Sequence, residues 1–398
     1  MKLAYYPGCS AEGSAIEYDL STRKTALLLG TELQELEDWN CCGATSAHNT
    51  NKILSWALPA RNLAIAEKNG MDFILAPCAA CYSRLHSTEV LARRDKVIRE
   101  QIQDVIEMEF TAQTSTISVL EWLDRQVGIE KIKGQIKKPL KGMKAACYYG
   151  CLLVRPVEYT GFDDPEDPQS MDRIVKALGA ETVEWSHKSE CCGAALATSR
   201  PEVGVKMIYE IIKNAKNAGA ECLVTACPLC MMNLDMRQAG ALKAAGEKIG
   251  MPVYYVTELV ALAAGVSPAE IGISKHFVEA DSYITSLAAK VAALATSAPA
   301  KGEKDAGKKE NVDSGEDAQD LQKKIDAMVQ AFNKNPDKIA SRLIKDQERA
   351  KLLGEIIARD EKKIGRLAEL MVTDKEKACK AAEAFVTGEL KKREKSSS

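Results

Sequence analysis

No stretch of about 18 uncharged apolar residues occurs in this chain, so we expect no helix that spans a membrane. The longest apolar run, residues 253–266, is interrupted by Glu258. The first residues contain no apolar segment of the length typical of a secretory signal, and we therefore expect a cytoplasmic protein. The formal net charge of −2 gives no general attraction to nucleic acids, so we expect no nucleic-acid partner.

Two redox patterns are also missing. The chain contains neither the ferredoxin run C-x2-C-x2-C-x3-C nor a glycine-rich fingerprint for a flavin or nucleotide, so electrons must come from another protein. Cysteine, in contrast, is abundant, with 13 residues. A secreted disulfide scaffold would be short and would carry a signal peptide. In a reducing cytosol, clustered cysteines are better explained as metal ligands or redox groups.

An internal repeat accounts for most of these cysteines. Ten of the 13 fall into two sets of five, at an offset of about 142 to 150 residues. The spacing is Cys-x31-Cys-Cys-x35-Cys-x2-Cys in the first copy and Cys-x39-Cys-Cys-x34-Cys-x2-Cys in the second. The first cysteine set is Cys9, Cys41, Cys42, Cys78 and Cys81, and the second cysteine set is Cys151, Cys191, Cys192, Cys227 and Cys230. Such regular spacing indicates two similar sites.

The residues around the cysteines predict an α/β fold in each copy. Short apolar runs predict strands at residues 2–6, 71–76, 143–149 and 221–225, and apolar spacing of three and four predicts helices at residues 53–69 and 201–217. Alternating strands and helices predict two pseudo-symmetric domains, each with a small, mainly parallel sheet flanked by helices. Because ligands gather where such strands end, we expect both cysteine sets at these ends.

Four segments are predicted along the chain. We expect a first cysteine-rich domain at residues 1–140 and a second at residues 141–290. Residues 291–316 are predicted to form a flexible linker, because the chain from about residue 296 is rich in Ser, Ala, Pro, Gly and Lys. Residues 317–398 are strongly charged with helical apolar spacing, and predict a C-terminal helical extension.

Five thiols in each copy leave several chemical interpretations. Structural zinc takes four ligands and would leave one cysteine of each set unexplained, although thiolate sites can also take zinc. Disulfides are disfavoured by the reducing compartment. Ordinary cubane iron–sulfur sites use four cysteines, so a fifth thiol points to a more open cluster or to additional ligand bonds.

A few residues beside the two sets could take part in the chemistry. His48 follows the first Cys-Cys pair and His187 precedes the second, and either imidazole could donate a proton to a departing thiolate or be an ordinary hydrogen-bonded loop histidine. Lys188 and Arg155 flank the second set and could attract an anionic substrate, or be surface charges. We take His48, His187 and Lys188 as candidate catalytic residues.

The remaining cysteines and histidines receive other interpretations. Cys147 and Cys222 lie outside the repeated pattern and are interpreted as buried structural cysteines. Cys379 lies in the charged extension and is given no role, and neither His86 nor His276 is given one.

The two cysteine motifs resemble the cysteine-rich CCG domain family, in particular the B subunits of heterodisulfide reductases. The resemblance covers about residues 1–290, and the segment Tyr-Tyr-Gly-Cys-Leu-Leu-Val-Arg-Pro at 148–156 is especially similar. It implies that each cysteine set binds one noncubane [4Fe-4S] cluster through all five thiols. It also implies a small disulfide substrate held between the two clusters, such as the coenzyme M–coenzyme B heterodisulfide of methanogenesis in anaerobic organisms.

The same resemblance implies partners and leaves an alternative open. Proteins of this kind work with a ferredoxin-like C subunit and with a flavin-containing A subunit, which supplies electrons. Relatives also occur in lactate, glycerol-3-phosphate and fumarate or succinate oxidoreductases, where the chain would be an electron-transfer iron–sulfur subunit. A zinc-bearing assembly protein is a third possibility. The segment after residue 296 departs from the usual B subunit, which leaves the partner set open.

Overall fold

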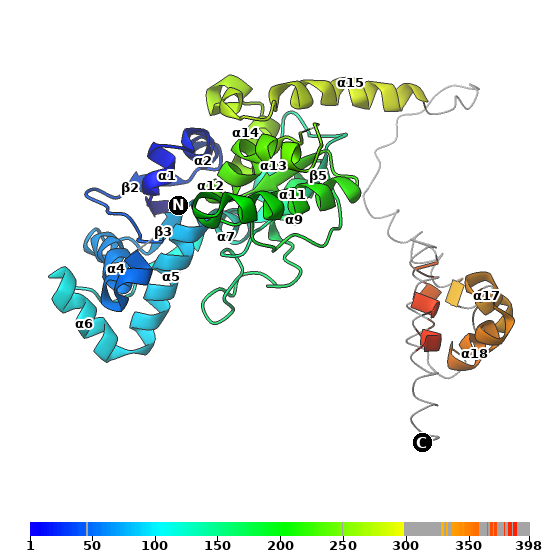
Figure 1. Ribbon diagram of the computed structural model, residues 1–398, viewed down its shortest axis with the longest axis horizontal. Coiled ribbons are helices and arrows are strands. Elements are labelled where there is room, and N and C mark those ends of the chain that lie inside the picture. Colours follow the sequence, from blue (N-terminus) through cyan, green and yellow to red (C-terminus); the bar gives the residue numbers. More distant parts are fainter. Residues whose placement is uncertain are drawn as a thin grey trace, which may run out of the picture. The chain divides into compact units, whose positions relative to one another are not determined.

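The computed structural model describes residues 1–44, 47–248 and 250–297, together with parts of the segment between residues 328 and 387. The chain divides into two compact units, residues 1–300 and 301–398, and each is described by itself. Figure 1 shows the first unit with its first half in blue to cyan beside its second half in green to yellow. None of the helices in the described ranges is long and apolar enough to cross a membrane.

The first half is built on a parallel sheet of four strands in the order β2-β1-β3-β4. The central strands β1 and β3 are short and almost wholly buried, because helices cover the sheet. The strands are β1 (Lys2–Tyr5), β2 (Glu32–Glu35), β3 (Phe73–Ala76) and β4 (Ser115–Ser118). The helices are α1 (Gly8–Glu12), α2 (Ile16–Leu28), α3 (Ala47–Thr50), α4 (Lys52–Lys68), α5 (Ala79–Arg94), α6 (Lys96–Ile106), α7 (Val119–Glu121), η1 (Trp122–Gly128) and α8 (Ile129–Lys133).

The second half repeats this topology with a parallel sheet in the order β6-β5-β7-β8. The strands are β5 (Lys144–Tyr148), β6 (Glu181–Thr182), β7 (Cys222–Thr225) and β8 (Val253–Tyr255). The helices are α9 (Ser170–Ala177), α10 (Leu196–Ser199), α11 (Pro201–Asn217), α12 (Pro228–Met231), η2 (Met232–Met236), α13 (Gln238–Ala244), α14 (Val256–Ala263), η3 (Pro268–Ile271), η4 (Ile273–Lys275) and α15 (Asp281–Ser297). The predicted fold class is confirmed: the chain contains two equivalent α/β halves with small parallel sheets.

The two halves share one hydrophobic core, and helices α2 and α14 pack against each other. The ring of Tyr18 stacks on that of Tyr255, with centroids 3.9 Å apart. Beside the rings, the hydroxyls of Ser21 and Thr257 are hydrogen-bonded at 2.8 Å. This buried contact fixes the two sheets relative to each other.

The C-terminal unit has its own apolar core, which includes Phe332, Leu353 and Leu367. Helix α17 (Pro336–Leu343) begins at Pro336, where proline fits the first helical turn, and α18 (Gln347–Ile357) follows it. Helices were predicted in this extension. Of the predicted linker at residues 291–316, residues 291–297 belong to α15 and the rest lie outside the described residues. The domain borders at 140 and 290 stay predictions.

Candidate functional site

The first cysteine set gathers beyond the carboxyl ends of the strands in the first sheet. Cys9 lies in α1, which follows β1. Cys78 follows β3 as the N-cap residue of α5, and Cys81 lies in the first turn of that helix. The sulfurs of Cys42 and Cys81 are 3.2 Å apart. Strand ends and the start of one helix therefore deliver these thiols to one place.

The second cysteine set repeats this arrangement on the second sheet. Cys151 follows β5, Cys227 is the N-cap residue of α12, and Cys230 lies within α12. The sulfurs of Cys192 and Cys230 are 3.7 Å apart. The structure thus brings one pair of thiols in each predicted set into contact, and the assignment of all five cysteines to one site stays a prediction.

Tyrosines at the ends of β1 and β5 hold the loops that carry the Cys-Cys pairs. The buried Tyr6 donates a hydrogen bond from its hydroxyl to the carbonyl of Asn40 at 2.9 Å. The buried Tyr148 donates in the same way to the carbonyl of Glu190 at 2.6 Å. Each acceptor immediately precedes a Cys-Cys pair, so these bonds fix the pairs against the strand ends.

A glycine in each half keeps the space beside the sulfurs free. Gly8 and Gly150 both have a φ of +67°, a conformation that glycine adopts without strain. A Cβ atom on Gly8 would lie 3.2 Å from the sulfur of Cys81. A Cβ atom on Gly150 would lie 3.2 Å from the sulfur of Cys230. Any other residue at either position would therefore crowd the thiols.

Both sets have a buried inner side and a more open outer side. The more accessible thiols are Cys9 and Cys41, which are exposed, and Cys151 and Cys191, which are partly exposed. The other thiols of the two sets are buried.

The two sets meet at their inner sides. Cys78 and Cys227 are both buried, and the Cys227 thiol raises the pKa of the Cys78 thiol. The inner cysteines of the two sets therefore interact across the junction of the halves. Sequence spacing predicted two sites but not this contact, which joins cysteines far apart in the chain.

Crowding makes the ionisation of each thiol depend on its neighbours. A hydrogen bond from Cys41 lowers the pKa of Cys42 to about 3, and one from Cys151 lowers the pKa of Cys191 to about 2. In return, the hydrogen bond to Cys42 raises the pKa of Cys41. Because each thiolate opposes ionisation of the next thiol, a set cannot ionise fully without added positive charge.

The donor set fits an iron–sulfur cluster. Thiolates are the soft ligands that such clusters take, and bound iron would supply the positive charge that full ionisation requires. Within the described residues, no three His, Cys, Asp or Glu side chains are arranged to hold a single metal ion.

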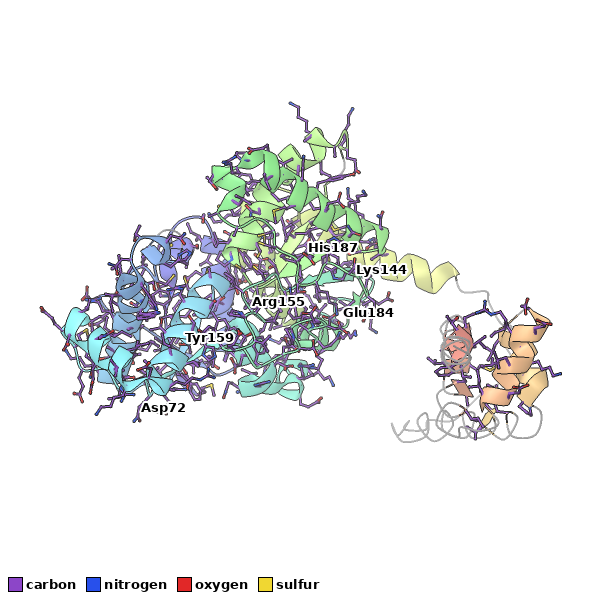
Figure 2. All side chains as sticks on the ribbon, turned by 60° about the horizontal axis from the view of Figure 1, so that its bottom comes forward. Asp72, Lys144, Arg155, Tyr159, Glu184 and His187 are labelled. Carbon is purple, nitrogen blue, oxygen red and sulfur yellow. The ribbon has the colours of Figure 1, made fainter. Side chains whose placement is uncertain are left out.

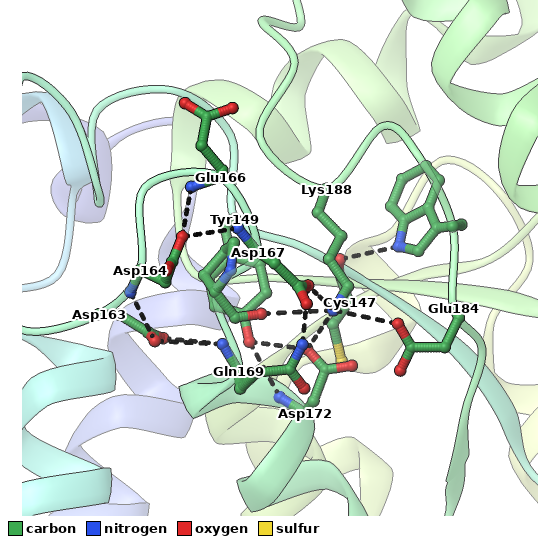
Figure 3. Close-up of polar contacts among 12 residues, drawn as sticks. Cys147, Tyr149, Asp163, Asp164, Glu166, Asp167, Gln169, Asp172, Glu184 and Lys188 are labelled. Atoms are coloured by element: carbon green, nitrogen blue, oxygen red, sulfur yellow. Dashed lines mark hydrogen bonds and ion pairs between the residues drawn. The ribbon is translucent and has the colours of Figure 1, made fainter. Parts of the chain in front are cut away.

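Lys188 is buried and engaged in ion pairs, as Figure 3 shows. Its Nζ lies 3.1 Å from Asp167 Oδ1 and 3.5 Å from Asp172 Oδ2. Its backbone carbonyl accepts hydrogen bonds from the N–H groups of Tyr149 and Gly150 at 2.8 and 3.1 Å. Lys188 therefore ties the loop before the second Cys-Cys pair to the end of β5, and it is not an exposed cation.

The other predicted polar residues lie at the margins of the two sets. His48 Nδ1 is 3.4 Å from the carbonyl oxygen of Gly43, which directly follows the first Cys-Cys pair. His187, labelled in Figure 2, is 2.8 Å from the Ser186 hydroxyl through its Nδ1. Arg155 forms an ion pair with Glu166 at 2.9 Å. These contacts leave the predicted catalytic roles of the two histidines untested.

The loop after Cys151 reaches the first half of the unit. The carbonyl oxygen of Tyr159, labelled in Figure 2, lies 2.7 Å from His86 Nε2 on α5. The carbonyl oxygen of Glu158 accepts a hydrogen bond from Arg94 at 3.3 Å. His86, which the sequence left without a role, therefore helps to join the two halves.

The sequence analysis missed two residues that interact with the thiols. Asn233 Nδ2 is 3.4 Å from the sulfur of Cys192 and donates to it. The guanidinium of Arg84 interacts electrostatically with Cys42. Each of these residues comes three positions after the last cysteine of a C-x-x-C motif, which places it one helical turn further on. That spacing is a signal that the sequence already contained.

Cys147 and Cys222 are completely buried in β5 and β7, in agreement with their structural interpretation. Cys379 lies outside the described residues. His276 is buried, and its Nε2 is 2.9 Å from Glu258 Oε1.

Known proteins share this double motif. The family model described as a cysteine-rich domain, CCG, matches residues 3–86 and 145–235. An 8-methylmenaquinol:fumarate reductase membrane anchor subunit of Wolinella succinogenes is 36% identical over 70% of this chain and 98% of its own length. The B subunit of a ferredoxin/F(420)H(2)-dependent CoB-CoM heterodisulfide reductase of Methanosarcina acetivorans is 29% identical over 70% of this chain and 94% of its own.

A solved structure shares the fold. A hypothetical protein from Helicobacter pylori superposes with a TM-score of 0.58 at 12% sequence identity. The match covers 70% of this chain and 52% of that chain. At this identity the likeness concerns the fold alone.

Proposed function

Since the chain belongs to the family with paired cysteine-rich CCG domains, we propose that it reduces a small disulfide as the catalytic subunit of a heterodisulfide reductase-like complex. The chain is similar to B subunits of heterodisulfide reductases. The reaction is R–S–S–R′ + 2 e⁻ + 2 H⁺ → R–SH + R′–SH. Each cysteine set would hold one noncubane [4Fe-4S] cluster through its five thiols. When bound, the two clusters would supply one electron each, which matches the two electrons that a disulfide requires.

One observation carries this proposal: the two cysteine sets meet at Cys78 and Cys227 while their outer thiols face solvent. A disulfide must reach both sites at once, and two unconnected sites on opposite faces could not serve it. The exposed thiols of Cys9 and Cys41 and the partly exposed thiols of Cys151 and Cys191 would give a substrate access. The coenzyme M–coenzyme B heterodisulfide is one such substrate.

The polar residues at the margins would handle protons and shape the site. His48 and His187 are candidates to donate the two protons, because imidazole titrates near neutral pH. Lys188 would act as a positioning residue, since its ammonium is already paired with Asp167 and Asp172. Electrons would arrive from a ferredoxin-like C subunit and a flavin-containing A subunit. We place the complex in the cytoplasm of an anaerobic organism.

A second function is favoured by one specific observation. The fumarate reductase subunit of Wolinella succinogenes is 36% identical to this chain. In that case the chain would be an electron-transfer subunit of a fumarate or succinate oxidoreductase complex. The clusters would then relay electrons without binding a sulfur substrate.

Anaerobic iron and sulfide analysis, followed by electron paramagnetic resonance, separates these functions. About eight irons per chain would be expected if both sets hold four-iron clusters. A new paramagnetic signal on addition of a thiol to the oxidised protein would support disulfide chemistry. Full iron loading with a signal that is insensitive to thiols would leave the electron-transfer function. Zinc without sulfide would overturn both.

A further inference from the structure

The two halves of the first unit match each other down to single side chains. Tyr6 and Tyr148 make the same hydrogen bond to the residue before a Cys-Cys pair. Gly8 and Gly150 share the same φ and the same distance to a cysteine sulfur. Against this background, a position where the halves differ in charge next to the thiols needs a functional explanation.

The position three residues after each C-x-x-C motif is such a difference. In the first half it is Arg84, one helical turn after Cys81 on α5; the sulfur of Cys81 is 3.2 Å from that of Cys42, and Arg84 donates to the carbonyl of Ser55. Its Nε is buried and has no hydrogen-bond partner among the described residues. A guanidinium nitrogen without a partner is costly in a buried place, so local hydrogen bonding alone does not account for Arg84 at this position.

In the second half the same position is Asn233. Its amide nitrogen donates to the sulfur of Cys192 at 3.4 Å and to the carbonyl of Cys192 at 3.1 Å. Its amide oxygen accepts a hydrogen bond from Arg237 at 3.0 Å. The second set therefore contacts an amide dipole. The positive charge of Arg237 contacts the amide of Asn233, which lies between Arg237 and the sulfur of Cys192.

Lys188 does not give the second set the positive charge that Arg84 gives the first. Lys188 is the buried cation of the second half, but Asp172 and Asp167 neutralise it. Solvent exposure, like the charge of Arg84, favours reduction of the first set, because Cys9 and Cys41 are exposed whereas Cys151 and Cys191 are only partly exposed. Charge, hydrogen bonds and solvent exposure are the factors that set the potential of an iron–sulfur site.

We propose that Arg84 makes the first cysteine set the more easily reduced of the two sites, while Asn233 keeps the second at a lower potential. The inference rests on the proposed function, since it requires an iron–sulfur cluster on each set. One-electron reduction adds one negative charge to a site. The Arg84 guanidinium stabilises that charge as a full cation, and Asn233 does so only as a dipole. The first electron from a partner protein therefore rests beside Arg84.

A redox titration of the iron-loaded chain tests this. Dithionite donates one electron to each site, and electron paramagnetic resonance follows the two reductions. The wild-type chain is expected to show two midpoint potentials. Arg84→Gln is expected to lower the equilibrium constant for one-electron reduction of the higher-potential site at least tenfold, which lowers its midpoint potential by about 59 mV. The lower midpoint potential should stay unchanged. Arg84→Lys is expected to restore most of the shift, because it restores the charge.

Arg94→Gln is the matched control. It removes an equal charge from α5, ten residues and about 15 Å further along the helix, and should move neither midpoint. Asn233→Leu gives a second reading that is independent of Arg84: it should lower only the lower midpoint. A single wild-type midpoint, an equal shift of both midpoints in Arg84→Gln, or an Asn233→Leu effect on the higher midpoint would overturn the inference. Loss of iron and sulfide in the wild type would instead overturn the proposed function.

Discussion

The Cys227 thiol raises the pKa of the Cys78 thiol where the two halves of the first unit meet, and both cysteines are buried. Each follows the third strand of its sheet and begins a helix, so the duplicated topology itself brings them together. Two sites on separate domains could exchange electrons only across intervening protein. Here the halves present equivalent thiols to each other, so two clusters on these sets would lie side by side.

Loss of Cys78 should affect its own set first. We expect Cys78→Ser to lower the iron content by about half, because the second set keeps all five of its thiols. Anaerobic iron and sulfide analysis measures this. Cys222→Ser is the control: this cysteine is equally buried in β7 but outside both sets, and its replacement should leave iron content unchanged. Full iron content in Cys78→Ser would show that Cys78 is not a ligand.

Gly8 offers a test of the space beside the sulfurs. Gly8→Ala combines backbone strain with a methyl group 3.2 Å from the sulfur of Cys81. Gly70→Ala is its matched control, since Gly70 has a φ of +65° with nothing within 4 Å of the added atom. Both variants should lose about 1–2 kcal/mol of stability through the backbone. Only Gly8→Ala should also lose iron from the first set, and equal iron contents would show that the space is unimportant.

Lys188 separates a positioning role from a catalytic one. Lys188→Met leaves the carboxylate of Asp172 buried without its cation, which should cost about 3–5 kcal/mol of unfolding free energy. Denaturant unfolding measures this cost. Lys213→Met, which removes a half-exposed lysine paired with Glu210, should change stability by less than about 0.5 kcal/mol. A stable Lys188→Met protein without disulfide reductase activity would instead favour the catalytic role predicted from sequence.

Much of this site could be predicted from the sequence, because its cysteines recur at fixed spacing and short apolar runs mark the strands that deliver them. The burial of Lys188 could not, since its partners Asp167 and Asp172 belong to a different loop and helix and no periodicity links them. The roles of Arg84 and Asn233 needed the helical geometry after each C-x-x-C motif. The Cys78–Cys227 contact depends on how the halves pack, which local patterns do not encode.

His276 provides a pH-dependent element in the second half. Burial disfavours its cation, but the charge and hydrogen bond of Glu258, with the charges of Asp235 and Glu17, outweigh burial and raise the pKa of His276 to about 9. Burial also raises the pKa of Glu258. Both groups therefore bind protons more tightly in the folded chain than in the unfolded chain.

Stability linked to this pair should fall as pH rises. The stabilisation by His276 is fully present below its unfolded pKa of about 6.5 and is lost as pH passes the folded value of about 9. The raised pKa of Glu258 acts in the same direction, because the folded state again holds the extra proton. Across this range we expect a loss of about 3 kcal/mol that is specific to the pair.

The variant His276→Gln keeps a hydrogen-bond donor beside Glu258 but cannot titrate, so it should lose this pH dependence. Denaturant unfolding at pH 6, 7.5 and 9.5, followed by tryptophan fluorescence, measures it, and all 4 tryptophans lie in the first unit. The cysteines titrate in both proteins, so the difference between wild type and variant isolates the histidine. His187→Gln, a partly exposed histidine outside this pair, should follow the wild type. Parallel curves for wild type and His276→Gln would mean that the buried pair carries no titrating proton between pH 6 and 9.5.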